Sequence, residues 1–185
     1  MNQTADIFIY IILGTSLVIA VVSDLRVQRI PNLLTFSLVA AGLGVHFGTQ
    51  GFSGLAFSAE GLGLGIALFL LPYLMGGMGA GDAKLMGAVG AILGPKGVFI
   101  AALFTAAVGG IYALVLLFLN SAYARGMVTR SATTLKTFAL TGQFIAIPAP
   151  EDEERKKPRL CYGVAIAAGT FFYMILKWSG HLWIR

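Results

Sequence analysis

Two aspartates stand beside strongly apolar sequence and are the residues best suited to chemistry. Asp82 ends the glycine-rich stretch 76–82, which has apolar residues on both sides. Asp24 follows the first apolar segment, residues 6–22. An ionisable group beside a hydrophobic span is costly unless it is paired or faces a water-filled cavity. A carboxylate in each of these positions therefore suggests chemistry.

Two carboxylates held a few ångströms apart form an acid–base pair. Like charges at such a separation cannot both ionise cheaply, so one carboxyl keeps a proton and the pair titrates as a unit. The ionised member can activate a water molecule while the protonated member donates to a substrate carbonyl. Peptide hydrolysis by an aspartic mechanism suits this equipment. Gly79 and Gly81, just before Asp82, would let an extended substrate backbone approach closely.

The composition predicts an all-α, polytopic membrane protein. The chain has 185 residues, of which 57% are hydrophobic and 11% charged, whereas a soluble domain carries about 25% charged residues. Because a span needs about 20 apolar residues, about six transmembrane helices use up most of the chain. We expect a single membrane-embedded domain over residues 1–185. The expected spans are approximately 6–22, 33–47, 59–74, 83–93, 98–119 and 160–178, with a loop at 48–58.

The charged residues and the cysteine narrow the possible class of protein and of ligand further. A net charge of +5 suits nucleic-acid binding or a membrane protein with basic cytoplasmic loops; the apolar composition favours the lipid bilayer, and no nucleic acid is expected. The single cysteine, Cys161, excludes an internal disulfide and a cysteine-based zinc site within one chain. No metal or organic cofactor is implied.

The basic residues predict the orientation of the chain. Ten of the thirteen Lys and Arg fall in the first, third and fifth connections between the expected spans, which the positive-inside rule places in the cytoplasm with both termini outside. Asp24 and Asp82 then share the cytoplasmic side. The fifth connection, about 120–159, is expected to form a cytoplasmic loop, either as a basic amphipathic helix on the membrane surface or as a solvated loop.

The residues alone leave two further roles open for the aspartates. Asp24 could pair with Arg26 or Arg29, and Asp82 with Lys84, in purely structural ion pairs. Paired acidic groups and broken helices also serve ion or proton transport. The simplest role of the three basic side chains is to set the topology or to contact lipid headgroups, and a second role for Lys84 is to lower the pKa of one aspartate.

The connection after Asp24 is expected to end where the second span begins. Pro31 biases the residue before it away from helix. Asn32 is then expected to cap the N-terminus of the next helix, because its side chain can accept a hydrogen bond from a free backbone N–H.

Two motifs resemble the signatures of the type IV prepilin peptidase family. Residues 24–35, Asp-Leu-Arg-Val-Gln-Arg-Ile-Pro-Asn-Leu-Leu-Thr, resemble the first signature, and residues 79–84, Gly-Ala-Gly-Asp-Ala-Lys, resemble the second, Gly-x-Gly-Asp. The resemblance extends over essentially the whole chain, including a late stretch at 162–169. It implies that Asp24 and Asp82 are catalytic. The positions that it implies to be supporting or substrate-binding are Gly79, Gly81, Lys84, Pro31 and Asn32.

The resemblance also implies a reaction and its place in the cell. Members of the family are aspartic endopeptidases that remove a short, positively charged leader from prepilin and pseudopilin precursors at the cytoplasmic face of the inner membrane. Larger members add a cytoplasmic domain with paired Cys-x-x-Cys motifs and N-methyltransferase activity. This chain begins with its first span and has one cysteine, so it looks like the short, peptidase-only branch of tight-adherence (Flp-type) pili, without methyltransferase activity.

Several alternatives stay open beside this resemblance. Archaeal preflagellin peptidases share the aspartate pair. The non-enzyme alternatives are an ion-coupled transporter and a structural subunit of a pilus-assembly complex. Presenilin-like proteases also carry a Gly-x-Gly-Asp motif, but their other aspartate follows a tyrosine, whereas Ser23 precedes Asp24 here.

Overall fold

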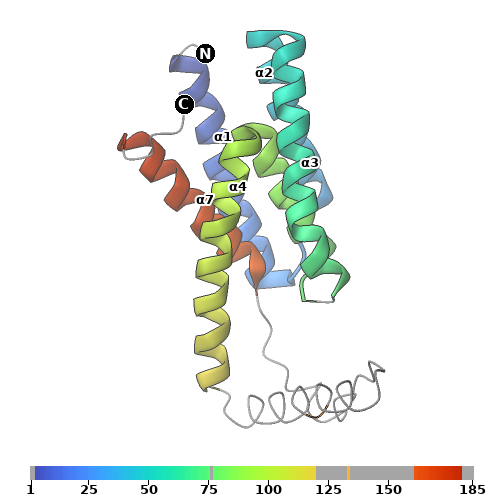
Figure 1. The fold of residues 1–185 in the computed structure, drawn as a ribbon, viewed down its shortest axis with the longest axis vertical. Helices are drawn as coiled ribbons and strands as arrows, with labels where there is room; N and C mark the ends of the chain where they lie inside the picture. The colour runs from blue at the N-terminus through green and yellow to red at the C-terminus, as the bar shows by residue number, and fades with distance from the viewer. Residues whose placement is uncertain (1–2, 76, 120–132, 134–160, 181–185) are drawn as a thin grey trace. The chain divides into compact units, whose positions relative to one another are not determined.

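The computed structural model describes residues 3–75, 77–119, 133 and 161–180, and the regular structure within them is entirely helical (Figure 1). The expected all-α fold is therefore confirmed. In lipid, backbone polar groups must find partners within their own segment, which favours helices. The helices are α1 (Gln3–Val27), α2 (Asn32–Gln50), α3 (Phe52–Leu74), α4 (Ala80–Leu119) and α7 (Tyr162–Trp178).

The chain divides into two compact units. Residues 1–109 and 161–185 form the first unit, and residues 110–160 form the second. Asp24 and Asp82 both belong to the first unit. Apart from residues 110–119 and 133, the second unit lies outside the described residues, and so does the predicted cytoplasmic loop at 120–159 except for residue 133.

Helix α4 reverses direction within its length. Gly94 has φ 74° and ψ 179°, a left-handed conformation that glycine adopts without a Cβ penalty. Residues 80–93 before it and 95–109 after it run in opposite directions in Figure 1. Together with α1, α2, α3 and α7, these two segments make six helical segments among the described residues, in line with the expected number of spans.

Glycines allow α3 and the first segment of α4 to touch along their backbones. A Cβ added at Gly61 would collide with the backbone of Gly90, and one added at Gly65 would collide with the backbone of Met86. Gly61 and Gly65 share one helix face because they are four residues apart. In a membrane, where burial of apolar surface does not distinguish protein from lipid, such close contact supplies much of the helix association.

Side chains of α2 and α3 donate hydrogen bonds to two backbone carbonyls at the break in α4, one of which lacks its helical donor. Pro95 lacks the N–H that would bond to the carbonyl of Ala91, and Ser58 Oγ donates to that carbonyl at 2.6 Å. His46 Nε2 donates to the carbonyl of Ile92 at 3.0 Å. The segment before the break is about 21 Å long, shorter than a hydrocarbon core of about 30 Å. Irregular backbone at such a depth is tolerated only where protein satisfies it.

The loop expected at 48–58 is wrong. Only Gly51, with φ 62°, separates α2 from α3, and Ser53 Oγ, within the first turn of α3, donates to the carbonyl of Gln50 at 2.7 Å. Gly54 serves packing, because a Cβ there would collide with the carbonyl of His46. Glycine and serine resemble a loop in sequence, but here they let two membrane helices meet at a tight turn.

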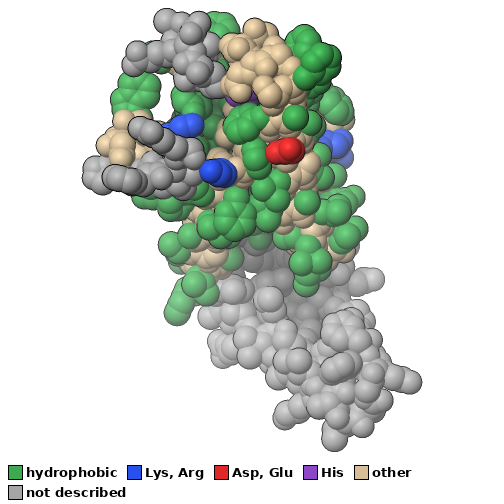
Figure 2. Space-filling model, turned by 45° about the horizontal axis from the view of Figure 1, so that its top comes forward, with side chains coloured by type: hydrophobic (Ala, Val, Ile, Leu, Met, Phe, Trp, Pro, Cys, Tyr) green, Lys and Arg blue, Asp and Glu red, His purple; other side chains and the backbone are tan. Residues whose placement is uncertain are grey.

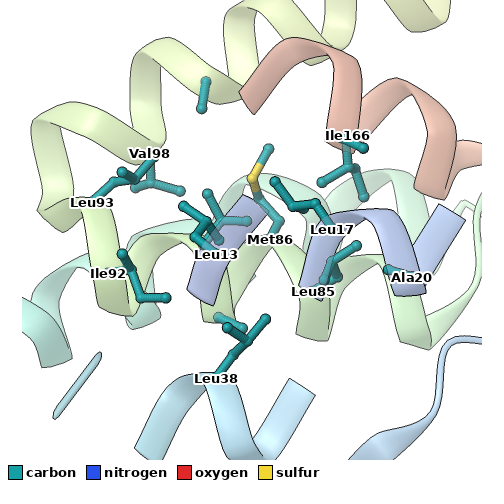
Figure 3. Packing of buried hydrophobic residues seen from close by; sticks show 14 of the residues in the cluster. Leu13, Leu17, Ala20, Leu38, Leu85, Met86, Ile92, Leu93, Val98 and Ile166 are labelled. Atoms are coloured by element: carbon teal, nitrogen blue, oxygen red, sulfur yellow. The ribbon is translucent and has the colours of Figure 1, made fainter. Parts of the chain in front are cut away.

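Apolar side chains fill the centre of the bundle and also cover its surface. The buried cluster in Figure 3 includes Leu13 and Leu17 from α1, Leu38 from α2, Met86 from α4 and Ile166 from α7. Hydrophobic side chains also dominate the described surface in Figure 2, and soluble monomers rarely expose such continuous apolar area. Four of the helices are long and apolar enough to cross a membrane. The chain is therefore a multi-pass membrane protein.

Candidate active site

Asp24 lies within α1, which continues past residue 22, where the first span was expected to end, as far as Val27. The backbone N–H of Gln28 still bonds to the carbonyl of Asp24 at 2.9 Å, so the polar sequence remains helical. The Asp24 side chain is only 7% exposed. Its Oδ2 accepts a hydrogen bond of 2.9 Å from the backbone N–H of Gly163, which is 139 residues away in the chain.

This bond joins the end of α1 to the start of α7. Gly163 lies in the first turn of α7, where backbone N–H groups have no partner inside the helix. Cys161, which precedes the helix, supplies no side-chain cap. The carboxylate of Asp24 takes that place, and negative charge is favourable at a helix N-terminus.

Asp82 lies in the first turn of α4, which begins at Ala80 rather than at residue 83 as expected. Its side chain is buried. Its Oδ2 accepts the backbone N–H of Gly79 at 3.0 Å, and its own N–H donates to the Gly79 carbonyl at 3.1 Å. This reciprocal pair satisfies donors at the helix start in the manner of a capping box. The local sequence from Gly79 to Asp82 therefore fixes the Asp82 side chain.

The fold brings the two aspartates to the same end of the bundle. The end of α1 and the starts of α4 and α7 meet there in Figure 1, and the charges of Asp24 and Asp82 lie close enough to interact. Ile30, between α1 and α2, packs on the start of α4: a Cβ added at Gly81 would lie 3.3 Å from the Cβ of Ile30. Two carboxylates from distant parts of the chain thus share one site.

Cys161 is a third ionisable residue beside the pair. Burial raises the pKa of its thiol, and the charges of Asp24 and then of Asp82 raise that pKa further. Both effects favour the protonated form of the thiol. Within the described ranges, no three His, Cys, Asp or Glu side chains gather as a metal site requires.

The basic residues near the site have partners other than the aspartates. Lys84 Nζ donates to Asn32 Oδ1 at 3.0 Å and lies 5.9 Å from the centre of the Phe36 ring. Arg26 and Arg29 are exposed. In the part of the chain that the structure describes, no ion pair joins either aspartate to these three residues. Lys84 instead ties the start of α2 to the start of α4.

The capping role expected of Asn32 is wrong. Pro31, with φ −61° and ψ 130°, takes the position before α2, and no side chain caps the helix. The Pro31 carbonyl accepts the N–H groups of Leu34 and Thr35 at 3.1 and 3.3 Å. Proline suits this place because its fixed φ continues into a helix. The Asn32 side-chain oxygen is left to accept the hydrogen bond from Lys84.

The sequence did not point to Gly163 or Cys161 as parts of the site. Both lie at the start of the last span, beside or within the stretch 162–169, which resembles the family without an assigned role. The available signal was a glycine at the start of an apolar helix. Such a glycine has many structural uses, and the hydrogen bond that matters comes from its backbone.

A comparison with protein-family models matches residues 11–114 to Peptidase_A24, the type IV leader peptidase family. The match covers 104 of the 185 residues and includes both Asp24 and Asp82. Neither the curated proteins nor the solved structures contain a match to the chain. With more than half of the chain matched, this multi-pass membrane protein belongs to the type IV leader peptidase family.

Proposed function

We propose that the protein is an aspartic endopeptidase that removes the leader peptide from prepilin and pseudopilin precursors. One observation carries the proposal: two buried carboxylates, from α1 and from α4, lie at the same end of the bundle. Each has one oxygen held by a glycine N–H. Among the described residues, the other oxygen of each has no hydrogen-bond partner, so it is available for proton transfer.

In the proposed reaction, Asp24 and Asp82 share one proton. The ionised carboxylate takes a proton from a water molecule, whose oxygen attacks the scissile carbonyl carbon, while the protonated carboxyl donates its proton to the carbonyl oxygen. The tetrahedral intermediate then collapses. Its C–N bond breaks as one hydroxyl of the intermediate returns its proton to the pair and the departing amine takes a proton from the pair, so that one shared proton remains. Either aspartate can begin as the acid in this cycle.

The substrate would approach the pair from the side of the glycine-rich stretch. Gly79 is exposed and Gly81 is half-buried, so an extended backbone could pass close to both. Pro31, Asn32 and Lys84 border the same end of the bundle, where the hydrogen bond between Lys84 and Asn32 fixes the start of α2 against α4. We assign these three residues a supporting role.

The proposed location is the inner membrane, with the catalytic pair facing the cytoplasm and residues 1–185 acting as one peptidase domain. The support is the distribution of basic residues, because ten of thirteen belong to the connections on the side of the aspartates. The positively charged leader of a precursor would meet the two carboxylates on that side. The single cysteine supports cleavage without methylation by this chain.

The direct test is cleavage by the purified protein in detergent. We expect incubation with a Flp-type prepilin to give a shortened product, and mass spectrometry to show an unmethylated new N-terminus even with S-adenosylmethionine present. Cleavage of a preflagellin alone would favour the archaeal alternative, and a methylated product would contradict the peptidase-only assignment. No cleavage of any precursor by folded protein would favour a transporter or a structural subunit.

A further inference from the structure

The start of α7 contributes a residue that neither carries a reactive group nor lies within the matched region 11–114. We propose that Gly163 is a positioning residue for Asp24, fixing the carboxylate through its backbone N–H and through the absence of a side chain. The inference deepens the proposed function and rests on it. Two independent features of Gly163 carry it.

The first feature is the hydrogen bond. The N–H of Gly163 lies 2.9 Å from Asp24 Oδ2, and hydrogen bonds to an ionised acceptor are stronger than those between neutral groups. The bond occupies one carboxylate oxygen and restricts rotation of the carboxyl group. The second oxygen, Oδ1, then has a fixed position from which to serve the reaction.

The second feature is space. A Cβ added at Gly163 would lie 2.8 Å from Asp24 Oδ2 and 3.1 Å from both Cβ and Cγ of Asp24. Any side chain at this position would therefore displace the carboxylate. Gly79, the donor to the other aspartate, differs, because a Cβ there would lie 3.5 Å from Asp82 Oδ2, an ordinary contact distance. The steric requirement for glycine is specific to the Asp24 side of the pair.

The packing of α1 on α7 makes the arrangement rigid. The two helices are antiparallel neighbours: Asp24 meets Gly163 at one end, and a Cβ at Gly14 would lie 3.5 Å from the Phe171 ring further along. The position of Asp24 thus depends on where α7 is held. A shift of about 1 Å in a catalytic group can reduce the rate about 100-fold.

The first experiment substitutes Gly163→Ala and measures prepilin cleavage per folded molecule. We expect kcat to fall about 100-fold or more, with KM nearly unchanged, because the change displaces a catalytic carboxylate and leaves the substrate surface intact. The matched control is Gly63→Ala, since an added Cβ at Gly63 meets nothing within 4 Å. The control should retain the kcat of the unchanged protein.

The second experiment removes only the N–H. Cys161 is a natural junction for chemical ligation, so a synthetic peptide of residues 161–185 can be joined to residues 1–160 with the Gly163 amide replaced by an ester. The ester adds no atoms that collide, so the full chain should fold, with a lower unfolding temperature because one hydrogen bond is lost. We expect kcat to fall about 10- to 100-fold, as for loss of a hydrogen bond to a charged group.

The outcomes separate the inference from the proposed function. A semisynthetic chain with the ordinary amide should cleave prepilin, and if it does not, the proposed function and this role both fail. If that chain cleaves and the ester chain keeps full kcat, Gly163 is not a positioning residue and the proposed peptidase stands. An effect on KM alone, or on the amount of folded protein alone, would likewise overturn the positioning role.

Discussion

The two ends of the bundle solve the same physical problem in opposite ways. At the break in α4, side chains donate to backbone: Ser58 and His46 bond to the carbonyls of Ala91 and Ile92. At the other end, backbone donates to side chains, through the glycine N–H groups that bond to Asp24 and Asp82. The side chains in these bonds are buried in both places, and both places use hydrogen bonds between segments.

The direction of hydrogen-bond donation decides which polar atoms stay available for chemistry. At the break, the donors are consumed in repairing the helix, and the bonds contribute stability. At the aspartate end, each carboxylate has two oxygens and the backbone occupies one of them. The second oxygen retains its capacity to bind or move a proton. Mutations at the two ends should therefore separate activity from stability.

The largest expected effect is the loss of the carboxylates themselves. Asp24→Asn or Asp82→Asn should reduce kcat by about 10²- to 10⁴-fold, the usual contribution of acid–base catalysis. The double substitution should be little worse, because members of one catalytic unit are not additive. Folding should be preserved, since the amide oxygen of asparagine can still accept the glycine N–H. The measurement is prepilin cleavage per folded molecule.

Glu60→Gln is the control for these substitutions. Glu60 is an exposed carboxylate of α3, and its neutralisation should leave cleavage unchanged. If an Asp24 or Asp82 variant keeps substantial specific activity, that residue is not part of the pair. If activity instead follows the amount of folded protein, the aspartates are structural.

A smaller effect should appear in the reactivity of Cys161. Its thiol has a raised pKa, caused first by burial and then by the charges of Asp24 and Asp82. Asp24→Asn removes one of these charges, lowers the thiol pKa and increases the thiolate fraction at about pH 8, near the ordinary pKa of a thiol. Alkylation by iodoacetamide should then be several-fold faster, because the thiolate is the nucleophile.

The comparison between the two aspartates sharpens this test. Asp82→Asn should accelerate alkylation less than Asp24→Asn, since the charge of Asp24 acts more strongly on the thiol. Mass spectrometry of the modified protein over time gives both rates. Equal rates in the unchanged protein and in both variants would show that Cys161 does not sense the pair.

The smallest effect belongs to the other end of the bundle. Ser58→Ala leaves the buried carbonyl of Ala91 without its side-chain donor, and should lower the free energy of unfolding by about 1 kcal/mol, as for other hydrogen bonds between membrane helices. Cleavage per folded molecule should not change. Thermal unfolding in detergent measures the first effect, with exposed Ser37→Ala as the control. Loss of kcat without loss of stability would contradict the division of roles between the ends.

The sequence carried enough information for the fold class and for the two aspartates. Apolar spans have an unmistakable composition, and an isolated carboxylate such as Asp24 stands out at the end of one. Gly163 could not be found in this way, because its hydrogen bond uses a backbone N–H that every residue except proline has, and its lack of a side chain matters only through contact with a distant residue. The contact also joins positions 139 residues apart, which local patterns do not encode.

The predicted helix boundaries were wrong where one residue type has two structural roles. Residues 48–58 resemble a loop, yet Gly54 permits close contact with His46 within a helical hairpin. Asn32 resembles an N-cap, yet Pro31 takes that place and Asn32 accepts a hydrogen bond from Lys84. In both regions tertiary packing determines which of the two roles the residue has. The local sequence does not encode that packing.

The order of synthesis also matters for the hydrogen bonds at the break in α4. His46 and Ser58 precede Ala91 and Ile92 in the chain, so the ribosome makes the donors before the carbonyls that need them. By the time the chain turns back at Gly94, the hairpin of α2 and α3 has already been synthesised and can bond to the end of the segment before the break. The order of synthesis thus spares the break from entering lipid with bare carbonyl groups, each of which costs several kcal/mol there.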